Sequence, residues 1–256
     1  MAKPFSRPDG RAPNALRHHR ITPGVMKHAE GSVLVEFGDT RVLCSLSVDE
    51  RVPRFLHGTG KGWLSAEYGM LPRATETRNM RDVKRAGPNG RSIEIGRLIG
   101  RALRPALDMK ALGERTLWID CDVLQADGGT RTAAITGSFV ALATGLANLQ
   151  RANKLAKPVL KGSVAAVSVG IYQGVPILDL NYPEDRDADS DVNVVMFGDG
   201  RLVEVQGTAE EAPFSFDEFN QMMELARSGI ATLNQAQLSA MAPFMDAKIW
   251  VDGAKP

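Results

Sequence analysis

The chain has 256 residues, of which 43% are hydrophobic and 24% are charged. This is the makeup of a globular protein that can bury one sizeable core. No stretch reaches the roughly 18 consecutive apolar residues of a membrane-spanning helix, and the first thirty residues contain no apolar segment typical of a secretory signal. The two cysteines lie in apolar runs without metal-ligand spacing. We therefore expect a cytoplasmic protein with no membrane span and no disulfide framework.

The charge is divided unevenly along the chain. Residues 1–110 contain 20 Lys and Arg against 11 Asp and Glu, for a net charge of +9, and residues 111–256 contain 11 against 19, for a net charge of −8. Because Arg and Lys neutralise phosphates whatever the base sequence, the first part is a candidate polyanion surface. The alternative is ordinary solvated charge, and specific motifs must separate the two.

The first part of the chain predicts a hairpin, a loop and a helix, in that order. Residues 31–49 form two β-branched, apolar runs around a turn at Gly38-Asp39, which is typical of a β-hairpin. Residues 53–89 have no clear periodicity and predict a long exposed loop, and loops of this length in compact domains are usually functional. Helical spacing follows over 92–107, with apolar residues on one side, arginines on the other, and Pro105 near its end.

A strand, a glycine turn and a helix start follow one another in the middle of the chain. Residues 116–125 alternate between apolar and polar side chains and predict a strand, and an Ala/Leu-rich helix is expected from the turn at 126–132 to about residue 151. Strands are then expected over 165–171 and 175–181.

The last part predicts a second hairpin and a long helix. The runs 191–197 and 202–206 flank a Gly-Asp-Gly turn. Ser215 is followed three residues later by Glu218, which is the form of a capping box, and an amphipathic helix should run from there to about residue 241.

Strands and helices thus alternate in two similar blocks, roughly residues 12–151 and 160–245. The second block opens with Gly-Ser-Val at 162–164, as the hairpin opens at 31–33, which indicates a weak internal repeat. No linker rich in Pro, Gly or Ser separates the blocks. We expect a single domain over residues 1–256, of α/β (α+β) class, with mixed sheets and helices packed on them.

The clearest functional feature is the turn 128–132, Gly-Gly-Thr-Arg-Thr, at a helix start. Helix N-termini present unpaired N–H groups and a partial positive charge, and glycines let an anion approach the backbone. This combination suits phosphate, although a simple strand-to-helix turn without a ligand could have the same sequence pattern. It is not a Walker A loop, because that spacing occurs nowhere in the chain.

A second feature is acidic. Asp179 closes a strand, and the segment 184–191 contains four aspartates and a glutamate. The segment fails the EF-hand pattern, and it suits Mg²⁺, which is commonly held by one or two carboxylates with waters and substrate phosphates. A solvated acidic loop is the alternative.

The third feature is basic: Arg73, Arg78 and Arg81 lie in the expected long loop, with Lys84 and Arg85 beyond them. No aromatic residues are interleaved, so we expect contact with a nucleic-acid backbone and no base-stacking platform. No Ser/His/Asp arrangement suggests itself. Together the three features imply phosphate-ester chemistry on a nucleic acid, in which inorganic phosphate could be the nucleophile since it needs positioning more than a strong base.

Several motifs closely resemble those of bacterial ribonuclease PH, and the resemblance spans nearly the whole chain. They are Arg7–Arg11 (RPDGR), Gly60–Trp63 with Ala66–Tyr68, Leu71–Thr75, Gly113–Thr116, Ala126–Thr132 and Glu204–Thr208.

The resemblance implies a phosphorolytic 3′ to 5′ exoribonuclease, also called a tRNA nucleotidyltransferase, that trims tRNA precursors, releases nucleoside diphosphates and works reversibly. It implies a fold of two related β-α units of the ribosomal protein S5 domain 2 type. It also implies a homohexameric ring built as a trimer of dimers, with RNA as partner, inorganic phosphate as co-substrate and Mg²⁺ or Mn²⁺ as cofactor.

The resemblance also assigns the anion sites. The family's phosphate-binding arginine matches Arg91, and its Gly-Thr-Arg phosphate site matches Gly129, Thr130 and Arg131. The arginines that bind the tRNA acceptor end match the basic loop at positions 73, 78 and 81.

The magnesium aspartates of the wider superfamily look most like Asp185 and Asp191, with Asp179 as a nearby third carboxylate. Asp187 and Asp189 remain alternatives, because the match there rests on spacing. We expect Arg91, Arg131 and the first two aspartates to be catalytic.

Two competing functions stay open. Some ring subunits with this fold are catalytically inert and bind RNA, but such subunits typically lose the phosphate turn or the carboxylates. A hydrolytic nuclease would release monophosphates in place of diphosphates.

Overall fold

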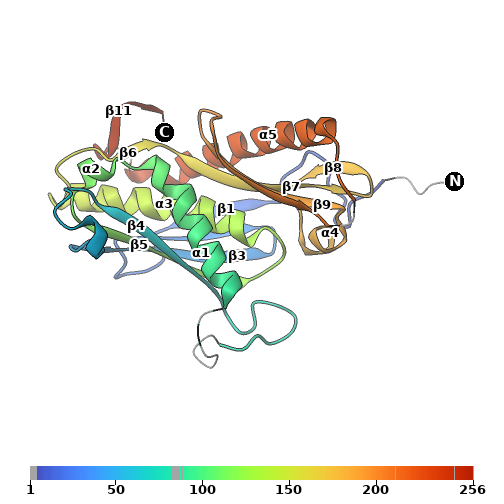
Figure 1. Cartoon of the computed structure of the whole chain (residues 1–256), viewed down its shortest axis with the longest axis horizontal. Helices are drawn as coiled ribbons and strands as arrows, with labels where there is room; N and C mark the ends of the chain where they lie inside the picture. The colour runs from blue at the N-terminus through green and yellow to red at the C-terminus, as the bar shows by residue number, and fades with distance from the viewer. Residues whose placement is uncertain (1–4, 82–86, 88, 211, 245, 256) are drawn as a thin grey trace.

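The computed structural model describes residues 5–81, 87, 89–210, 212–244 and 246–255. Its main elements are two β-sheets with a long helix between them and two further long helices that both contact it (Figure 1). The expected α/β class with mixed sheets and packed helices is confirmed.

The first sheet has the order β1-β2-β3-β5-β4. Its strands are β1 (His19–Pro23), β2 (Gly31–Phe37), β3 (Thr40–Asp49), β4 (Trp63–Met70) and β5 (Thr116–Gln125). The β2–β3 hairpin turns where the Gly-Asp pair predicted it, with Phe37 opposite Thr40.

The expectation of a long loop over 53–89 was wrong in its middle, because β4 lies there. β4 pairs in parallel with β5, from Trp63 opposite Thr116 to Met70 opposite Val123. The strand contains Ser, Ala and Gly, which are weak strand formers, and its partner comes some fifty residues later, so local periodicity gave little sign of it. The segment after β4 does project away from the body of the molecule (Figure 1).

The second sheet has the order β10-β9-β7-β8 and is antiparallel throughout. Its strands are β7 (Val164–Tyr172), β8 (Val175–Leu178), β9 (Ser190–Phe197) and β10 (Leu202–Ala209). β8 ends three residues before the expected 181. The acidic segment also differs from a loop, since α4 (Tyr182–Asp187) forms there. A short parallel pair, β6 (Leu160–Gly162) with β11 (Trp250–Lys255), forms a third sheet.

The helix α3 (Thr130–Arg151) forms the centre of the core. It packs against β2 and β3 of the first sheet and against β7 of the second. It is long and apolar enough to cross a membrane by length and composition, but 94% of its most apolar window is buried inside the protein. That burial is what a core helix between two sheets shows, and one continuous cluster of buried residues joins both sheets through it.

Two other long helices pack beside the core helix α3. The helix α1 (Gly90–Leu103) crosses β4 and packs near α3, and it passes into a 3-10 turn (Arg104–Ala106) where Pro105 was expected to end it. The helix α5 (Phe216–Met241) lies along β7 and β8 and begins with the predicted capping box between Ser215 and Glu218. Short helical turns occur at Arg54–Leu56, at α2 (Met109–Leu112) and at Ala242–Phe244.

Candidate active site

A cavity of about 440 Å³ opens where α1, α3, α4, the segment after β4 and the second sheet meet. Its lining residues are Met70, Thr75, Glu76, Thr77, Asn79, Arg91, Ala126, Gly128, Gly129, Thr130, Arg131, Ser168, Tyr182, Asp185, Asp191 and Asn193. One cavity therefore brings together residues 128–131 of the glycine turn, Arg91, Asp185 and Asp191. These residues are up to a hundred positions apart in the chain.

The glycine turn forms one wall of this cavity. Gly129 is the N-cap of α3, with a left-handed φ of 63°, and Thr130 begins the helix. The Thr130 hydroxyl accepts a hydrogen bond of 2.8 Å from the Tyr68 hydroxyl. Burial raises the pKa of Tyr68 to about 12, so the tyrosine stays a neutral donor at physiological pH. The first N–H groups of α3 are those that a helix leaves without internal partners.

A second helix begins at the same cavity. The side chain of Asn89 caps α1 by accepting a hydrogen bond of 3.1 Å from the backbone N–H of Arg91. Arg91 therefore lies in the first turn of α1, as Arg131 lies in the first turn of α3. Two helix N-termini, each with partial positive charge, and two guanidinium groups are directed to one space, and this arrangement favours a polyanionic ligand.

Arg131 is partly anchored and partly free. Its Nη2 lies 3.0 Å from Glu94 Oε2 on α1. Its Nε is buried and has no hydrogen-bond partner among the described residues. A buried donor without a partner is costly, so this atom is suited to a ligand oxygen.

The carboxylates of Asp185 and Asp191 also line this cavity. Burial, with the nearby charge of Asp185, raises the pKa of Asp191 to about 7. Burial also raises the pKa of Asp185, while Arg91 and Arg131 are close enough to oppose that shift. One oxygen of Asp191, Oδ1, is buried without a partner among the described residues. Asp185 is exposed at the cavity and Asp191 is half-buried, and a cation would stabilise this neighbouring pair, in which one oxygen of Asp191 has no partner among the described residues.

These carboxylates fit a divalent metal ion held jointly with substrate. Within the described ranges, no group of three or more His, Cys, Asp or Glu residues is arranged to hold a metal ion. Mg²⁺ needs no such cage, because it is commonly bound by one or two carboxylates together with waters and phosphates. Asp185 and Asp191 offer such a partial set of ligands.

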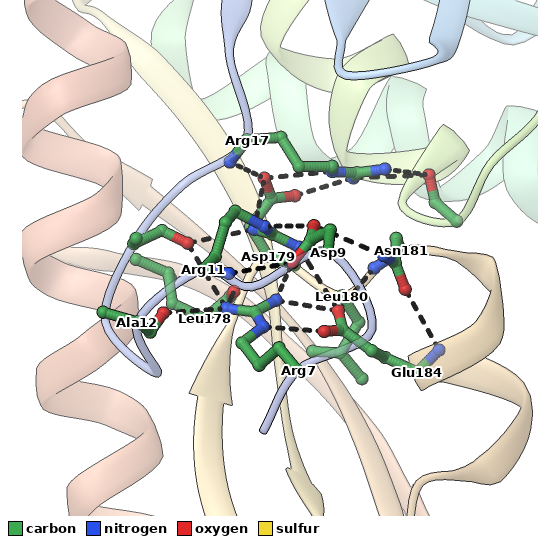
Figure 2. Close-up of polar contacts among 12 residues, drawn as sticks. Arg7, Asp9, Arg11, Ala12, Arg17, Leu178, Asp179, Leu180, Asn181 and Glu184 are labelled. Atoms are coloured by element: carbon green, nitrogen blue, oxygen red, sulfur yellow. Dashed lines mark hydrogen bonds and ion pairs between the residues drawn. The ribbon is translucent and has the colours of Figure 1, made fainter. Parts of the chain in front are cut away.

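Asp179 occupies a different place from the one expected of a third metal carboxylate. It is absent from the cavity lining, and both of its oxygens accept hydrogen bonds from Arg17, at 2.7 Å to Oδ1 and 3.1 Å to Oδ2 (Figure 2). Although burial favours its neutral form, the charge of Arg17 outweighs this and holds the pKa of Asp179 below its ordinary value. Asp179 is therefore a buried ion-pair partner, and its oxygens are already used.

The alternative aspartates also lie outside the cavity lining. Asp187 is exposed at the end of α4 and pairs with Arg186. Asp189 is half-buried in the residues between α4 and β9.

The basic loop lies beside the cavity. Arg73, Arg78 and Arg81 are exposed, while Thr75 and Asn79 of the same segment line the cavity and are joined by a hydrogen bond of 2.8 Å. The three arginines therefore flank the site without forming its walls. Lys84 and Arg85, expected to extend the basic loop, lie outside the described residues.

Several lining residues have no counterpart among the expected site residues. Ser168 and Asn193 come from the second sheet, and Tyr182 is 51% exposed at the start of α4. The helix itself could have been found, since Asn181 and Glu184 have capping-box spacing and form one in the structure. Their nearness to the glycine turn depends on tertiary structure alone.

Comparisons with known proteins agree with this geometry. Residues 15–145 match the family model described as 3′ exoribonuclease family, domain 1, and residues 162–229 match domain 2 of the same family. Among solved structures, rice (Oryza sativa) Rrp46 is similar with a TM-score of 0.74 and 19% identity, over 92% of this chain and all of that one.

Two exosome structures are similar to about the same degree. The Archaeoglobus fulgidus exosome with RNA bound to the active site has a TM-score of 0.73 and 21% identity, over 90% of this chain and 92% of that one. An archaeal exosome core has a TM-score of 0.70 and 20% identity, over 91% of both chains. At these identities the structural likeness establishes the fold, which is the ribonuclease PH fold of the S5 domain 2 type. The family follows from the domain models, since they cover more than half of the sequence: this chain belongs to the 3′ exoribonuclease family.

Proposed function

We propose that the chain is a phosphate-dependent 3′ to 5′ exoribonuclease of the bacterial ribonuclease PH type. The observation that carries the proposal is the convergence of the glycine turn, Arg91, Arg131 and a carboxylate pair on one cavity. A hydrolytic nuclease would need a positioned water but no second anion site. A phosphorolytic enzyme needs room and positive charge for two phosphates, the attacking one and the scissile one.

The attacking phosphate would bind at the starts of α3 and α1. The backbone N–H groups after Gly129, the Thr130 hydroxyl and the guanidinium of Arg131 offer donors on one side, and Arg91 offers a second cation. The unpartnered Nε of Arg131 supports this position. Because these groups are held by helices, they are oriented before phosphate arrives.

The scissile phosphodiester would lie between this wall and the carboxylates. Asp185 and Asp191 would hold Mg²⁺ or Mn²⁺, which when bound would neutralise charge on the phosphates as a Lewis acid. The raised pKa of Asp191 and its unpaired oxygen support a cation site.

In the proposed reaction, an oxygen of inorganic phosphate forms a bond to the phosphorus of the last phosphodiester. The bond from that phosphorus to the 3′ oxygen of the preceding nucleotide breaks, and the 3′ oxygen takes up a proton. The products are a nucleoside diphosphate and an RNA shortened by one nucleotide, and the reverse reaction is nucleotidyl transfer. Since the nucleophile is already an anion, catalysis would depend mainly on positioning and charge neutralisation.

We propose tRNA precursors as the substrate class, with their 3′ ends in the cavity and Arg73, Arg78 and Arg81 on the backbone upstream. These arginines are exposed beside the cavity, which supports a contact with RNA that does not depend on base sequence.

We also propose that the chain forms a homohexamer, built as a trimer of dimers, and that it acts in the cytoplasm. The edge strand β10 supports an interface between copies, because Leu202 and Val205 are exposed on it, with 56% and 39% of their surface accessible. The inert RNA-binding ring subunit is the competing function. The retained anion turn and carboxylate pair weigh against it.

A product assay tests the proposed function. A tRNA precursor with a short 3′ extension is incubated with the protein and Mg²⁺, with and without inorganic phosphate, and the released nucleotides are resolved. We expect diphosphates that appear only with phosphate. Monophosphates without phosphate would mean hydrolysis, and RNA binding without any product would favour the inert subunit.

A further inference from the structure

Arg17 joins three segments that are far apart in the sequence. Its backbone N–H and its Nε donate to Asp179 Oδ2, at 2.8 and 3.1 Å, and its Nη2 donates to Asp179 Oδ1 at 2.7 Å. Its Nη1 donates to the carbonyl oxygen of Asp127, the residue before the glycine turn, and both terminal nitrogens lie 3.5 Å from the Gly128 carbonyl oxygen. Arg17 thus connects the N-terminal segment, the residue that follows β8 and the glycine turn; Figure 2 shows its bonds to Asp179.

The glycine turn is built around this arginine. A Cβ atom at Gly129 would lie 2.9 Å from Arg17 Nη2. A Cβ atom at Gly128 would lie 2.6 Å from the carbonyl carbon of Asn181, beside the start of α4. The turn is therefore closed in by Arg17 on one side and by the backbone before α4 on the other, with no space for a side chain.

The backbone of Asp179, the residue that binds Arg17, is strained, as the backbone of residues at functional sites often is. Asp179 has a left-handed φ of 56°, which costs energy in a residue other than glycine and persists only where the surroundings fix it. The hydrogen bonds from Arg17 hold its carboxylate, and Arg7 Nη2 donates to its carbonyl oxygen at 3.0 Å. Asp179 lies three residues before the start of α4, the helix that contains Asp185.

The neighbouring arginine Arg7 fixes α4 itself. Its Nε and Nη2 donate to the two oxygens of Glu184, each at 2.7 Å, and its Nη1 donates to the Leu178 carbonyl oxygen at 2.9 Å. Neither side chain of this pair is exposed to solvent. Arg7 makes no contact with the glycine turn among the hydrogen bonds of the described residues, so it offers a comparison with Arg17.

We propose that Arg17 is a positioning residue for phosphate: held by Asp179, it sets the glycine turn at a fixed place relative to α4 and Asp185. Arg17 is not part of the cavity lining, so it acts through the backbone of the turn. The inference rests on the proposed phosphate-dependent function. It extends that function to a segment, residues 7–17, that lies outside the cavity.

An Arg17→Lys substitution distinguishes the effect of the positive charge of Arg17 from the effect of its guanidinium geometry. Lysine keeps the positive charge near Asp179, but its single ammonium nitrogen cannot span the carboxylate and the turn carbonyls as the planar guanidinium does. The buried charge pair survives in Arg17→Lys while the connection to the turn is lost.

The test compares Arg17→Lys and Arg7→Lys with the unmodified full-length protein. Binding of inorganic phosphate is measured by calorimetry without RNA, and the phosphate KM and kcat of RNA shortening are measured together with the melting temperature. For Arg17→Lys we expect a weakening of phosphate binding and a rise in phosphate KM on the order of tenfold to a hundredfold, as displaced binding groups cause. Affinity for RNA should stay within about twofold.

Arg7→Lys should lower the melting temperature to a similar degree without weakening phosphate binding, because it alters an equally buried arginine that does not touch the turn. An Arg17→Lys protein with unchanged phosphate affinity and phosphate KM would overturn the proposal, even if kcat fell with the folded fraction. Equal weakening of phosphate binding in both variants would overturn it as well, since general loosening would then be the cause.

The two proposals fail differently. If the unmodified protein binds phosphate but releases no diphosphates, the proposed function is wrong, and phosphate binding by the two variants still decides the role of Arg17. If the unmodified protein shortens RNA with phosphate and Arg17→Lys does so with an unchanged phosphate KM, only the role of Arg17 is wrong. If the unmodified protein binds no phosphate, both are wrong.

Discussion

Arg131 Nη2 lies 3.0 Å from Glu94 Oε2, so the first turn of α3 is tied to the first turns of α1 by an ion pair. The other oxygen of Glu94 accepts a hydrogen bond of 3.2 Å from Gln206 on β10. One edge of the Arg131 guanidinium is therefore fixed, and its buried Nε remains without a partner among the described residues. An arginine held in this way can meet an anion without first being ordered.

Replacing Arg131 by alanine should weaken the use of phosphate strongly. Loss of a partly buried charged hydrogen bond costs roughly 2 to 5 kcal/mol, which corresponds to a fall in kcat/KM for phosphate of about thirtyfold to five-thousandfold. Steady-state rates of diphosphate release over a range of phosphate concentrations measure this. Arg151→Ala is the control, because Arg151 lies at the other end of the same helix and pairs with exposed Asp246. An unchanged phosphate profile in Arg131→Ala would remove this residue from the phosphate site.

Asp191→Asn should stabilise the metal-free protein at pH 8 while abolishing its activity. The pKa of Asp191 is about 7 in the folded protein, through burial and the charge of Asp185, against an ordinary value of 3.8. Between pH 4 and 7 the folded state holds a proton that the unfolded state has released, so the free energy of unfolding falls as pH rises through this window. The loss is at most about 4 kcal/mol, since one pKa unit corresponds to about 1.4 kcal/mol, and asparagine avoids it.

Urea unfolding at pH 5 and pH 8, in the presence of a chelator, measures the effect. Mg²⁺ should stabilise the unmodified protein at pH 8 and have little effect on Asp191→Asn. Asp187→Asn is the matched control, because Asp187 is exposed on the same segment and paired with Arg186. Equal pH dependence of the Asp191 and Asp187 variants would contradict the buried carboxylate site.

The joint replacement of Arg73, Arg78 and Arg81 by alanine should weaken RNA binding without changing the phosphate KM. Each phosphate contact to single-stranded RNA contributes about 0.7 to the slope of log K against log salt, so three contacts contribute about 2. Fluorescence anisotropy with an extended tRNA precursor over a range of salt concentrations gives the slope.

A triple alanine variant at Arg51, Arg201 and Arg227 controls for net charge, since all three are exposed surface arginines. If both triple variants lose the same slope, the basic loop is solvated charge and contributes no specific contact.

Gly128→Ala should abolish phosphorolysis, whereas Gly58→Ala should only lower stability. Both glycines have a left-handed φ, 72° and 74°, so both substitutions carry a backbone cost of about 1 to 2 kcal/mol. Only at Gly128 would the added Cβ meet backbone, at 2.6 Å from the Asn181 carbonyl carbon, whereas nothing lies within 4 Å at Gly58. Melting temperatures and diphosphate release for both variants separate strain from displacement of the turn. Full activity in Gly128→Ala would show that the turn need not keep its contact with the segment before α4.

Local patterns in the sequence were sufficient for several elements. The β2–β3 hairpin followed from two apolar runs around Gly38-Asp39, and α5 followed from the Ser215 capping box and helical spacing, because these signals act between neighbours in the chain. The glycine turn at the start of α3 was also predictable, since a strand followed by two glycines and an apolar helical run marks a helix start, and Gly129 is its N-cap.

The sequence by itself thus determined the fold class, the family and the glycine turn at the start of α3. Tertiary structure alone decided which carboxylates face that turn: Asp185 and Asp191 line the cavity, while the oxygens of Asp179 are taken by Arg17. It also decided the parallel pairing of β4 with β5 and the place of Arg17 between the turn and the second sheet. The physical reason is that burial, the raised pKa of Asp191 and a buried ion pair depend on which segments pack together, and no local pattern records contacts made across more than a hundred residues.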